Sequence, residues 1–244
     1  MIPVLREDQR SFPPSPPTNL NDPATITAHD WTAFQRLETM QDHWNRPPWH
    51  DGHRAYYWML TFSDVPALVK TARLCQEALT PLRMDDVPED GLHITITKIG
   101  QPDQVDLGTI DALADQALSR IPAAFTADVH PLTASRGAVR CSVTPWSPLI
   151  DLHAALTEVN AQAGVPGGKP TSRFRPHLGV TYNNQERPTG PVAALVAPLR
   201  TLPPVNVRIA SVELVELRRE GRTYRWDVLY SLPLGSEATS DHLL

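Results

Sequence analysis

The chain has 244 residues and a formal net charge of −5, from 22 Lys and Arg against 27 Asp and Glu. Long duplex DNA is disfavoured as a partner, because affinity for duplexes comes mostly from phosphate neutralisation by Lys and Arg. A short nucleic-acid end or a nucleotide is compatible, since a local basic groove can hold one phosphate on an acidic protein. The 25 prolines are about twice the average usage of ~5%, which excludes long uninterrupted helices over much of the chain.

The two cysteines and the N-terminal residues lead us to expect a cytoplasmic protein without membrane contact. Cys75 and Cys141 cannot form a disulfide framework and are predicted to be small buried hydrophobes. Residues 1–10 carry both charge signs and no apolar run of signal-peptide length. No stretch approaches the ~18 apolar residues of a membrane span. We expect a monomer.

Three segments follow from composition. Residues 1–27 are rich in Pro, Ser and Asn and lack periodicity, so we expect a disordered or loosely docked arm. Residues 28–234 form one patterned block without a separating linker and are predicted to be a single domain. Residues 235–244 are predicted to be a polar tail.

Hydrophobic periodicity predicts the elements in chain order. The first is a helix over 28–45, with Trp31, Phe34, Leu37, Met40 and Trp44 on one face and Thr27 and Asp30 spaced as a capping box. There follow a strand over 55–62, a helix over 63–79, a strand over 92–100, a helix over 107–119, a hairpin over 125–133 and 138–143, a helix over 148–163, a strand over 175–182, a helix over 191–199, and a hairpin over 205–218 and 223–232. This order predicts an α+β fold with mostly antiparallel sheet. A helix followed by a His-bearing strand occurs twice, which indicates internal duplication.

Those two strands are Leu92-His93-Ile94-Thr95-Ile96-Thr97 and Pro176-His177-Leu178-Gly179-Val180-Thr181. Successive side chains of a strand point to opposite faces, so each strand buries an apolar face and presents its histidine and hydroxyls on the other. One His-x-Thr has little meaning alone. Two of them, each on the polar face of a clean strand, favour a shared site.

Two histidines with pKa values of ~6.5 suit general acid and general base catalysis at neutral pH. Neighbouring hydroxyls can hydrogen-bond the non-bridging oxygens of a phosphate. The pattern favours phosphoryl transfer between oxygens, notably opening or forming a 2′,3′-cyclic phosphate, with either histidine as the base. It requires no cofactor and no metal. His50 and His53 lack further clustered ligands.

At these residues the sequence resembles the 2H phosphoesterases, which carry paired His-x-Thr/Ser motifs about eighty residues apart. The flanks LHITITKIG and RPHLGVTYNN and the ending LVELRREGRTYRWDVLYSLPL are similar to the bacterial 2′-5′ RNA ligase-like branch. The resemblance covers about 55–234. It implies two pseudo-symmetric lobes of mostly antiparallel sheet, helices on the outer faces, and a central groove holding both histidines. It also implies cyclic phosphodiesterase activity on RNA ends or nucleotides, or reversible 2′-5′ RNA ligation, without metal.

The second motif departs from the pattern, because Gly179 stands where a hydroxyl residue is expected beside His177. Thr181 lies on the same face about 7 Å further along an ideal strand. An alternative function is therefore a non-catalytic module that keeps the groove for RNA ends or nucleotides.

The sequence-based site consists of His93 and His177 as catalytic residues and Thr95, Thr181, Arg175 and Tyr57 as substrate-binding residues. Arg175 is predicted to share the face of His177, and Tyr57 to supply a ring for base stacking. Arg173, Arg175 and Lys169 are cations near His177 that could attract a second phosphate or the RNA backbone, and Arg136 and Arg140 lie on the preceding hairpin. The expected partner is a short RNA end or nucleotide bearing a cyclic phosphate.

Overall fold

The computed structural model describes residues 4–47 and 49–235. Within them the helices are α1 Pro23–Gln35, α2 Pro66–Leu79, α3 Leu107–Leu118, α4 Ser147–Gln162 and α5 Thr189–Leu199. The strands are β1 Thr39–Met40, β2 Arg54–Thr61, β3 Asp85–Asp86, β4 His93–Gly100, β5 Phe125–Ala134, β6 Ala138–Thr144, β7 His177–Tyr182, β8 Arg187–Pro188, β9 Val205–Ile209, β10 Ser211–Glu220 and β11 Thr223–Pro233.

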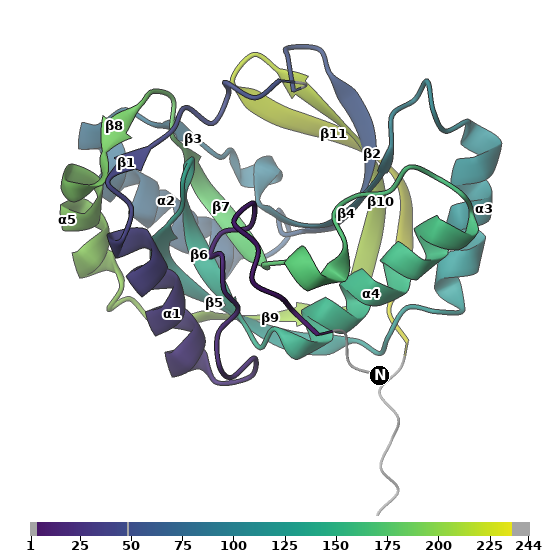
Figure 1. Cartoon of the computed structure of the whole chain (residues 1–244), viewed down its shortest axis with the longest axis horizontal. Coiled ribbons are helices and arrows are strands. Elements are labelled where there is room, and N and C mark those ends of the chain that lie inside the picture. The colour runs from purple at the N-terminus through teal and green to yellow at the C-terminus, as the bar shows by residue number, and fades with distance from the viewer. Residues whose placement is uncertain (1–3, 48, 236–244) are drawn as a thin grey trace, which may run out of the picture.

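Two antiparallel sheets define two lobes. The four-stranded sheet has the order β11-β10-β2-β4, and the five-stranded sheet has the order β3-β7-β6-β5-β9. In Figure 1, α3 and α4 cover the outer side of the first sheet, while α1, α2 and α5 lie on the outer side of the second. The predicted α+β fold with two lobes of antiparallel sheet is confirmed.

The lobes exchange helices, which ties them together. Helix α2 follows β2 of the four-stranded sheet but packs on β7 of the other lobe. Helix α4 follows β6 of the five-stranded sheet but packs on β4. Each His-bearing strand is thus covered by a helix that follows, in the chain, a strand of the opposite sheet. The repeated order of helix and His-bearing strand in the sequence corresponds to this exchange.

The first helix differs from its prediction at both ends. It begins at Pro23, with the Asp22 carboxylate accepting a hydrogen bond from the Thr25 N–H at 2.7 Å. Asp followed by Pro at the first helical position is a stronger start signal than the spacing of Thr27 and Asp30. The helix ends at Gln35, and beyond it Leu37 is half-buried while Met40 and Trp44 are buried. Met40 lies in β1, which pairs with β8.

The segment expected as a loose arm is packed against the body between the lobes (Figure 1). Leu5 and Ser11 are buried. The Arg6 N–H donates to the Ser172 carbonyl at 2.9 Å, and the Trp146 N–H donates to the Leu20 carbonyl at 2.7 Å. Local composition suggested disorder, but these long-range partners fix residues 4–22. The predicted polar tail lies outside the described residues except for Gly235.

The last hairpin also differs from its prediction, because the strand expected over 205–218 breaks at Ala210. Strand β9 pairs with β5 in one sheet, and β10 pairs with β2 and β11 in the other. The chain thus crosses from one lobe to the other within one residue. In the described ranges, no helix has the length and apolar character that crossing a membrane requires.

Candidate active site

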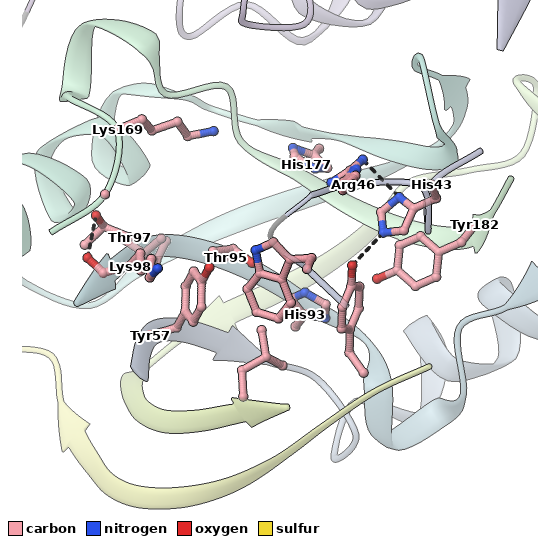
Figure 2. Close-up of a pocket in the computed structure, with 15 residues that line it drawn as sticks. His43, Arg46, Tyr57, His93, Thr95, Thr97, Lys98, Lys169, His177 and Tyr182 are labelled. Carbon is pink, nitrogen blue, oxygen red and sulfur yellow. Dashed lines mark hydrogen bonds between the residues drawn. The ribbon is translucent and has the colours of Figure 1, made fainter. Parts of the chain in front are cut away.

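A cavity of about 410 Å³ lies between β4 and β7, and we call it the histidine groove. Its lining residues are His43, Arg46, Trp49, Tyr57, His93, Thr95, Ile96, Thr97, Lys98, Gly168, Lys169, His177, Tyr182, Leu217 and Tyr224. Figure 2 shows His93 and His177 entering the groove from opposite walls. The fold therefore brings together two histidines that are 84 positions apart in the sequence.

Both histidines are held in the same way by the backbone two residues earlier. Nδ1 of His93 lies 2.8 Å from the Gly91 carbonyl oxygen, and Nδ1 of His177 lies 2.9 Å from that of Arg175. A carbonyl oxygen can only accept, so each Nδ1 carries the proton in the neutral ring. The Nε2 atom of each neutral ring is then left with a lone pair.

The surroundings of both rings favour the neutral form. Solvent reaches His177 more than His93, but the surrounding protein weakens hydration of an imidazolium. This desolvation lowers the pKa of His93, against a smaller opposite effect of the Gly91 carbonyl. Desolvation also lowers the pKa of His177 well below its ordinary value, and the positive charges of Arg140 and Lys169 add to the effect. The free groove is therefore suited to an anion, whose charge would raise both pKa values.

The two motif strands share an irregularity that decides which side chains reach the groove. In β4 the pairing with β2 skips Ile96 and, further along, Ile99, and in β7 the pairing with β6 skips Val180. In both strands a bulged residue is the third after the histidine. A bulge reverses the alternation of faces beyond it. The fifth residues after the histidines, Lys98 and Tyr182, consequently line the groove.

The bulge explains why Thr181 does not lie where the sequence analysis placed it. Its side chain is fully buried, and its hydroxyl donates to the Met84 sulfur at 3.3 Å. Thr181 is not part of the groove lining. Thr95, which precedes the bulge in β4, does line the groove as predicted.

A phenol stands beside the position of the missing hydroxyl. A Cβ atom at Gly179 would lie 3.6 Å from Tyr182 Cε1 and 3.7 Å from its Oη. Burial raises the pKa of Tyr182, so its hydroxyl remains a donor at neutral pH. That hydroxyl makes no hydrogen bond within residues 4–47 and 49–235. A donor is therefore present near Gly179, supplied from three residues later.

Arg175 is also used differently from its prediction. Its side chain is buried, and its Nε, Nη1 and Nη2 donate to five backbone carbonyls, which belong to Pro13, Ser172, Phe174, Arg6 and Pro14. A guanidinium has five N–H groups, so none is left for a substrate phosphate. Arg175 instead fastens the N-terminal arm to the strand that carries His177.

Aromatic side chains form much of the remaining wall. Tyr57 lines the groove as predicted, next to Trp49, whose ring centroid lies 6.0 Å from its own. Sequence analysis missed His43, which stacks on Tyr182 at 4.1 Å and lies 2.9 Å from the Tyr224 hydroxyl through Nε2. The many aromatic residues between 43 and 58 could have indicated a ligand-binding wall, but the helix predicted over 28–45 placed His43 on a helix instead.

The loop before β7 brings Lys169 to the groove. The Gly167 N–H donates to the Ile99 carbonyl at 2.8 Å, which ties this loop to β4. A Cβ at Gly168 would lie 3.0 Å from both the backbone nitrogen of Lys98 and the Thr97 hydroxyl oxygen. Only glycine allows so close an approach without displacement. Lys169 follows on the His177 side of the groove (Figure 2).

Comparisons with known proteins agree with this architecture. A model of the 2′-5′ RNA ligase superfamily matches residues 65–221. The chain therefore belongs to this superfamily, and its resemblance to the 2H phosphoesterases is confirmed. A comparison with curated proteins finds no match.

Three solved structures illustrate the shared fold. A crystal structure of a phosphoesterase is 19% identical, covers 75% of this chain and 99% of that chain, and has a TM-score of 0.56. E. coli LigT complexed with NADP+ is 18% identical, with coverages of 76% and 99% and a TM-score of 0.54. TT0787 of Thermus thermophilus is 19% identical, with coverages of 76% and 100% and a TM-score of 0.55. At these identities the similarity shows the fold alone.

Proposed function

We propose that the protein is a metal-independent phosphoesterase that opens 2′,3′-cyclic phosphates of RNA ends or nucleotides by two-histidine acid–base catalysis. One observation carries this proposal above the others. Two histidines from opposite lobes have Nδ1 fixed by a backbone carbonyl, which leaves both Nε2 atoms free in one groove. Reversible 2′-5′ RNA ligation uses the same two groups, with their roles exchanged.

In the hydrolytic direction we assign the base to His177, because the positive charges of Arg140 and Lys169 add to desolvation in keeping its free ring neutral. Its neutral Nε2 accepts a proton from water as the water oxygen forms a bond to phosphorus. His93, protonated when the anion is bound, donates a proton from Nε2 to the ribose oxygen as the P–O bond to that oxygen breaks. The products are a phosphomonoester and a ribose hydroxyl. The proton gained by His177 returns to solvent, and His93 is reprotonated.

The phosphate oxygens are contacted by the hydroxyls of Thr95 and Tyr182 and by the Lys98 ammonium, all of which line the groove. These donors favour the charge that develops on the non-bridging oxygens. Tyr57 and Trp49 offer aromatic faces on which a nucleobase can stack. Crystal structures of LigT with 3′-AMP, ATP and NADP+ support a nucleotide as the ligand class.

The test is hydrolysis of 2′,3′-cyclic AMP in excess EDTA by the full chain and by His93→Ala and His177→Ala. We expect a loss of about 10²–10⁴-fold in each variant, the usual contribution of a positioned acid or base. His130→Ala is the matched control, because His130 lies on β5 of the same sheet as His177 but outside the groove. Activity that survives both substitutions, or that needs a divalent metal, contradicts the proposal.

A second candidate function is a binding module without turnover, and Gly179 is the observation that favours it. In that case the chain binds 3′-AMP in the groove, His177→Ala weakens the binding, and no cyclic phosphate is hydrolysed. Measuring binding and turnover on the same preparation separates the two functions.

A further inference from the structure

A second cavity, of about 310 Å³, opens beside the histidine groove, and the two share Arg46, Lys169 and His177. The N-terminal arm contributes Arg10, Ser11 and Phe12 to its lining. We call this cavity the arm pocket. Because the two cavities share residues, a ligand seated at the histidines can extend into the arm pocket.

The lining of the arm pocket is strongly basic in a chain of net charge −5. Some of its cations are already paired. Arg10 and Arg173 both contact the Asp8 carboxylate, at 2.8 and 3.2 Å. Arg175 donates hydrogen bonds to backbone carbonyls of the arm.

Four further cations line the arm pocket, namely Arg46, Arg136, Arg140 and Lys169. None has a carboxylate within 4.0 Å in the part of the chain that the structure describes. This local excess of positive charge attracts anions even though the whole chain is acidic.

Two of these cations are held in place by the arm. The guanidinium carbons of Arg136 and Arg140 lie 5.5 and 5.4 Å from the centroid of the Phe12 ring. Arg136 also donates to the Gln9 carbonyl at 2.9 Å. Phe12 thus orders both side chains before any ligand arrives, which reduces the entropy lost on binding.

Arg140 has an unmet hydrogen-bonding capacity. Its side chain is only 3% exposed, and its Nε has no partner. The bond from its Nη2 to the Phe12 carbonyl is long, at 3.3 Å. The nearby buried carboxylate of Asp30 accepts from the Ser142 hydroxyl at 2.6 Å instead. A buried cation with an unsatisfied hydrogen-bond donor destabilises the fold unless an anion pairs with it.

Lys169 links the two cavities. Solvent reaches its side chain. Within 4–47 and 49–235 its ammonium has no hydrogen bond or ion pair and lies 5.9 Å from the centroid of the Phe174 ring. Desolvation, together with repulsion by Arg140, Arg173 and Arg175, lowers its pKa to about 8. An anion placed between Lys169 and Arg140 would relieve this repulsion.

We propose that the arm pocket binds a second phosphate group of the ligand whose first phosphate lies between His93 and His177. This inference rests on the proposed function and adds a preference to it: ligands with a second phosphate bind more tightly than those with one. Two sources share this chemistry, namely the last internal phosphodiester of an RNA end and the 5′-phosphate of a mononucleotide. The arm residues of this pocket precede residues 65–221, the part that matches the superfamily model, whereas Arg136, Arg140 and Lys169 lie within that part.

The test is calorimetric titration of the full chain with three stable ligands. These are 3′-AMP, adenosine 3′,5′-bisphosphate, and a diadenylate with a 3′-terminal phosphate. We expect at least one of the two-phosphate ligands to bind about tenfold or more tightly than 3′-AMP, as charge-assisted hydrogen bonds to a phosphate imply. Preference for the bisphosphate identifies a 5′-phosphate as the source, and preference for the diadenylate identifies an RNA end.

Variants of the arm pocket test whether its cations cause the preference for a second phosphate. In Arg136→Gln and in Lys169→Gln we expect the preference for the second phosphate to fall at least about threefold. Arg200→Gln is the matched control, because Arg200 also lies over an aromatic ring, Trp31 at 4.6 Å, and donates to a carbonyl, but lines neither cavity. Its preference should equal that of the parent chain.

Two results overturn the inference: a parent chain that binds all three ligands within about twofold, or a preference that survives in both pocket variants. Hydrolysis of 2′,3′-cyclic AMP is measured in parallel, so that the proposed function and the subsite can be refuted separately. If the second phosphate is preferred but no cyclic phosphate is opened, the proposed function is wrong and the subsite stands. If hydrolysis occurs without preference, only the subsite is wrong.

Discussion

Replacing Tyr182 by phenylalanine tests whether its phenol supplies the hydroxyl that Gly179 lacks. Phenylalanine keeps the ring that stacks on His43 at 4.1 Å and removes only the oxygen, which has no hydrogen-bond partner among the described residues. A hydrogen bond to a charged group contributes about 1.5–3 kcal/mol, so kcat/KM for 2′,3′-cyclic AMP should fall by roughly 10–150-fold. The unfolding midpoint in urea should stay within experimental error of the parent.

A reciprocal variant gives this prediction a second readout. A Cβ at position 179 would lie 3.6 Å from the Tyr182 ring, an ordinary van der Waals contact, so Gly179→Ser fits. Added to Tyr182→Phe, it should recover part of the lost activity. Tyr230→Phe is the control, because its hydroxyl donates to Asp111 outside the groove. A Tyr182→Phe variant with unchanged kcat/KM, or one that Gly179→Ser leaves unrescued, refutes the reasoning.

Three further predictions concern the arm, the pH–rate profile and stability. Arg175→Ala should lower the urea midpoint and speed proteolysis within residues 6–14, since each buried carbonyl left without a donor costs about 1–3 kcal/mol; equal cleavage rates would show that Arg175 does not hold the arm. The acid limb of kcat/KM should lie below pH 6.5, because the lowered pKa of His177 keeps the base neutral until the pH falls through it; a limb above 6.5 would contradict this assignment. Burial lowers the pKa of His153 from 6.5 to about 3, so its contribution to stability is full above pH 6.5 and is lost as the pH falls. In His153→Gln the free energy of unfolding should therefore depend less on pH between 6 and 5, by up to about 1.4 kcal/mol per pH unit, and an unchanged slope in urea titrations would exclude His153 as the source.

The sequence was sufficient for the features that depend on local pattern. Alternation in 92–97 and 176–181 predicted the two histidine strands, and β4 and β7 place both rings in one groove. Thr95 and Tyr57 also reached the groove as expected. These positions follow from hydrophobic alternation alone, because no irregularity separates Thr95 from His93.

Features that depend on pairing between distant segments were not predictable from the sequence. The bulges at Ile96 and Val180 arise from the register with β2 and β6, and the bulge at Val180 moves Thr181 out of the groove and Tyr182 into it. Nothing in the local sequence of Arg175 indicates its function, because three of its five acceptor carbonyls lie more than 160 positions away in the arm.

The account depends on His93 and His177 acting as one unit on one phosphate. The most direct test is the kcat for 2′,3′-cyclic AMP, in EDTA, of His93→Ala, His177→Ala and the double variant. Groups that act together are strongly non-additive, so we predict that the double variant loses about as much activity as either single variant. Losses that multiply, or a single variant with near-parental kcat, would contradict a shared two-histidine site.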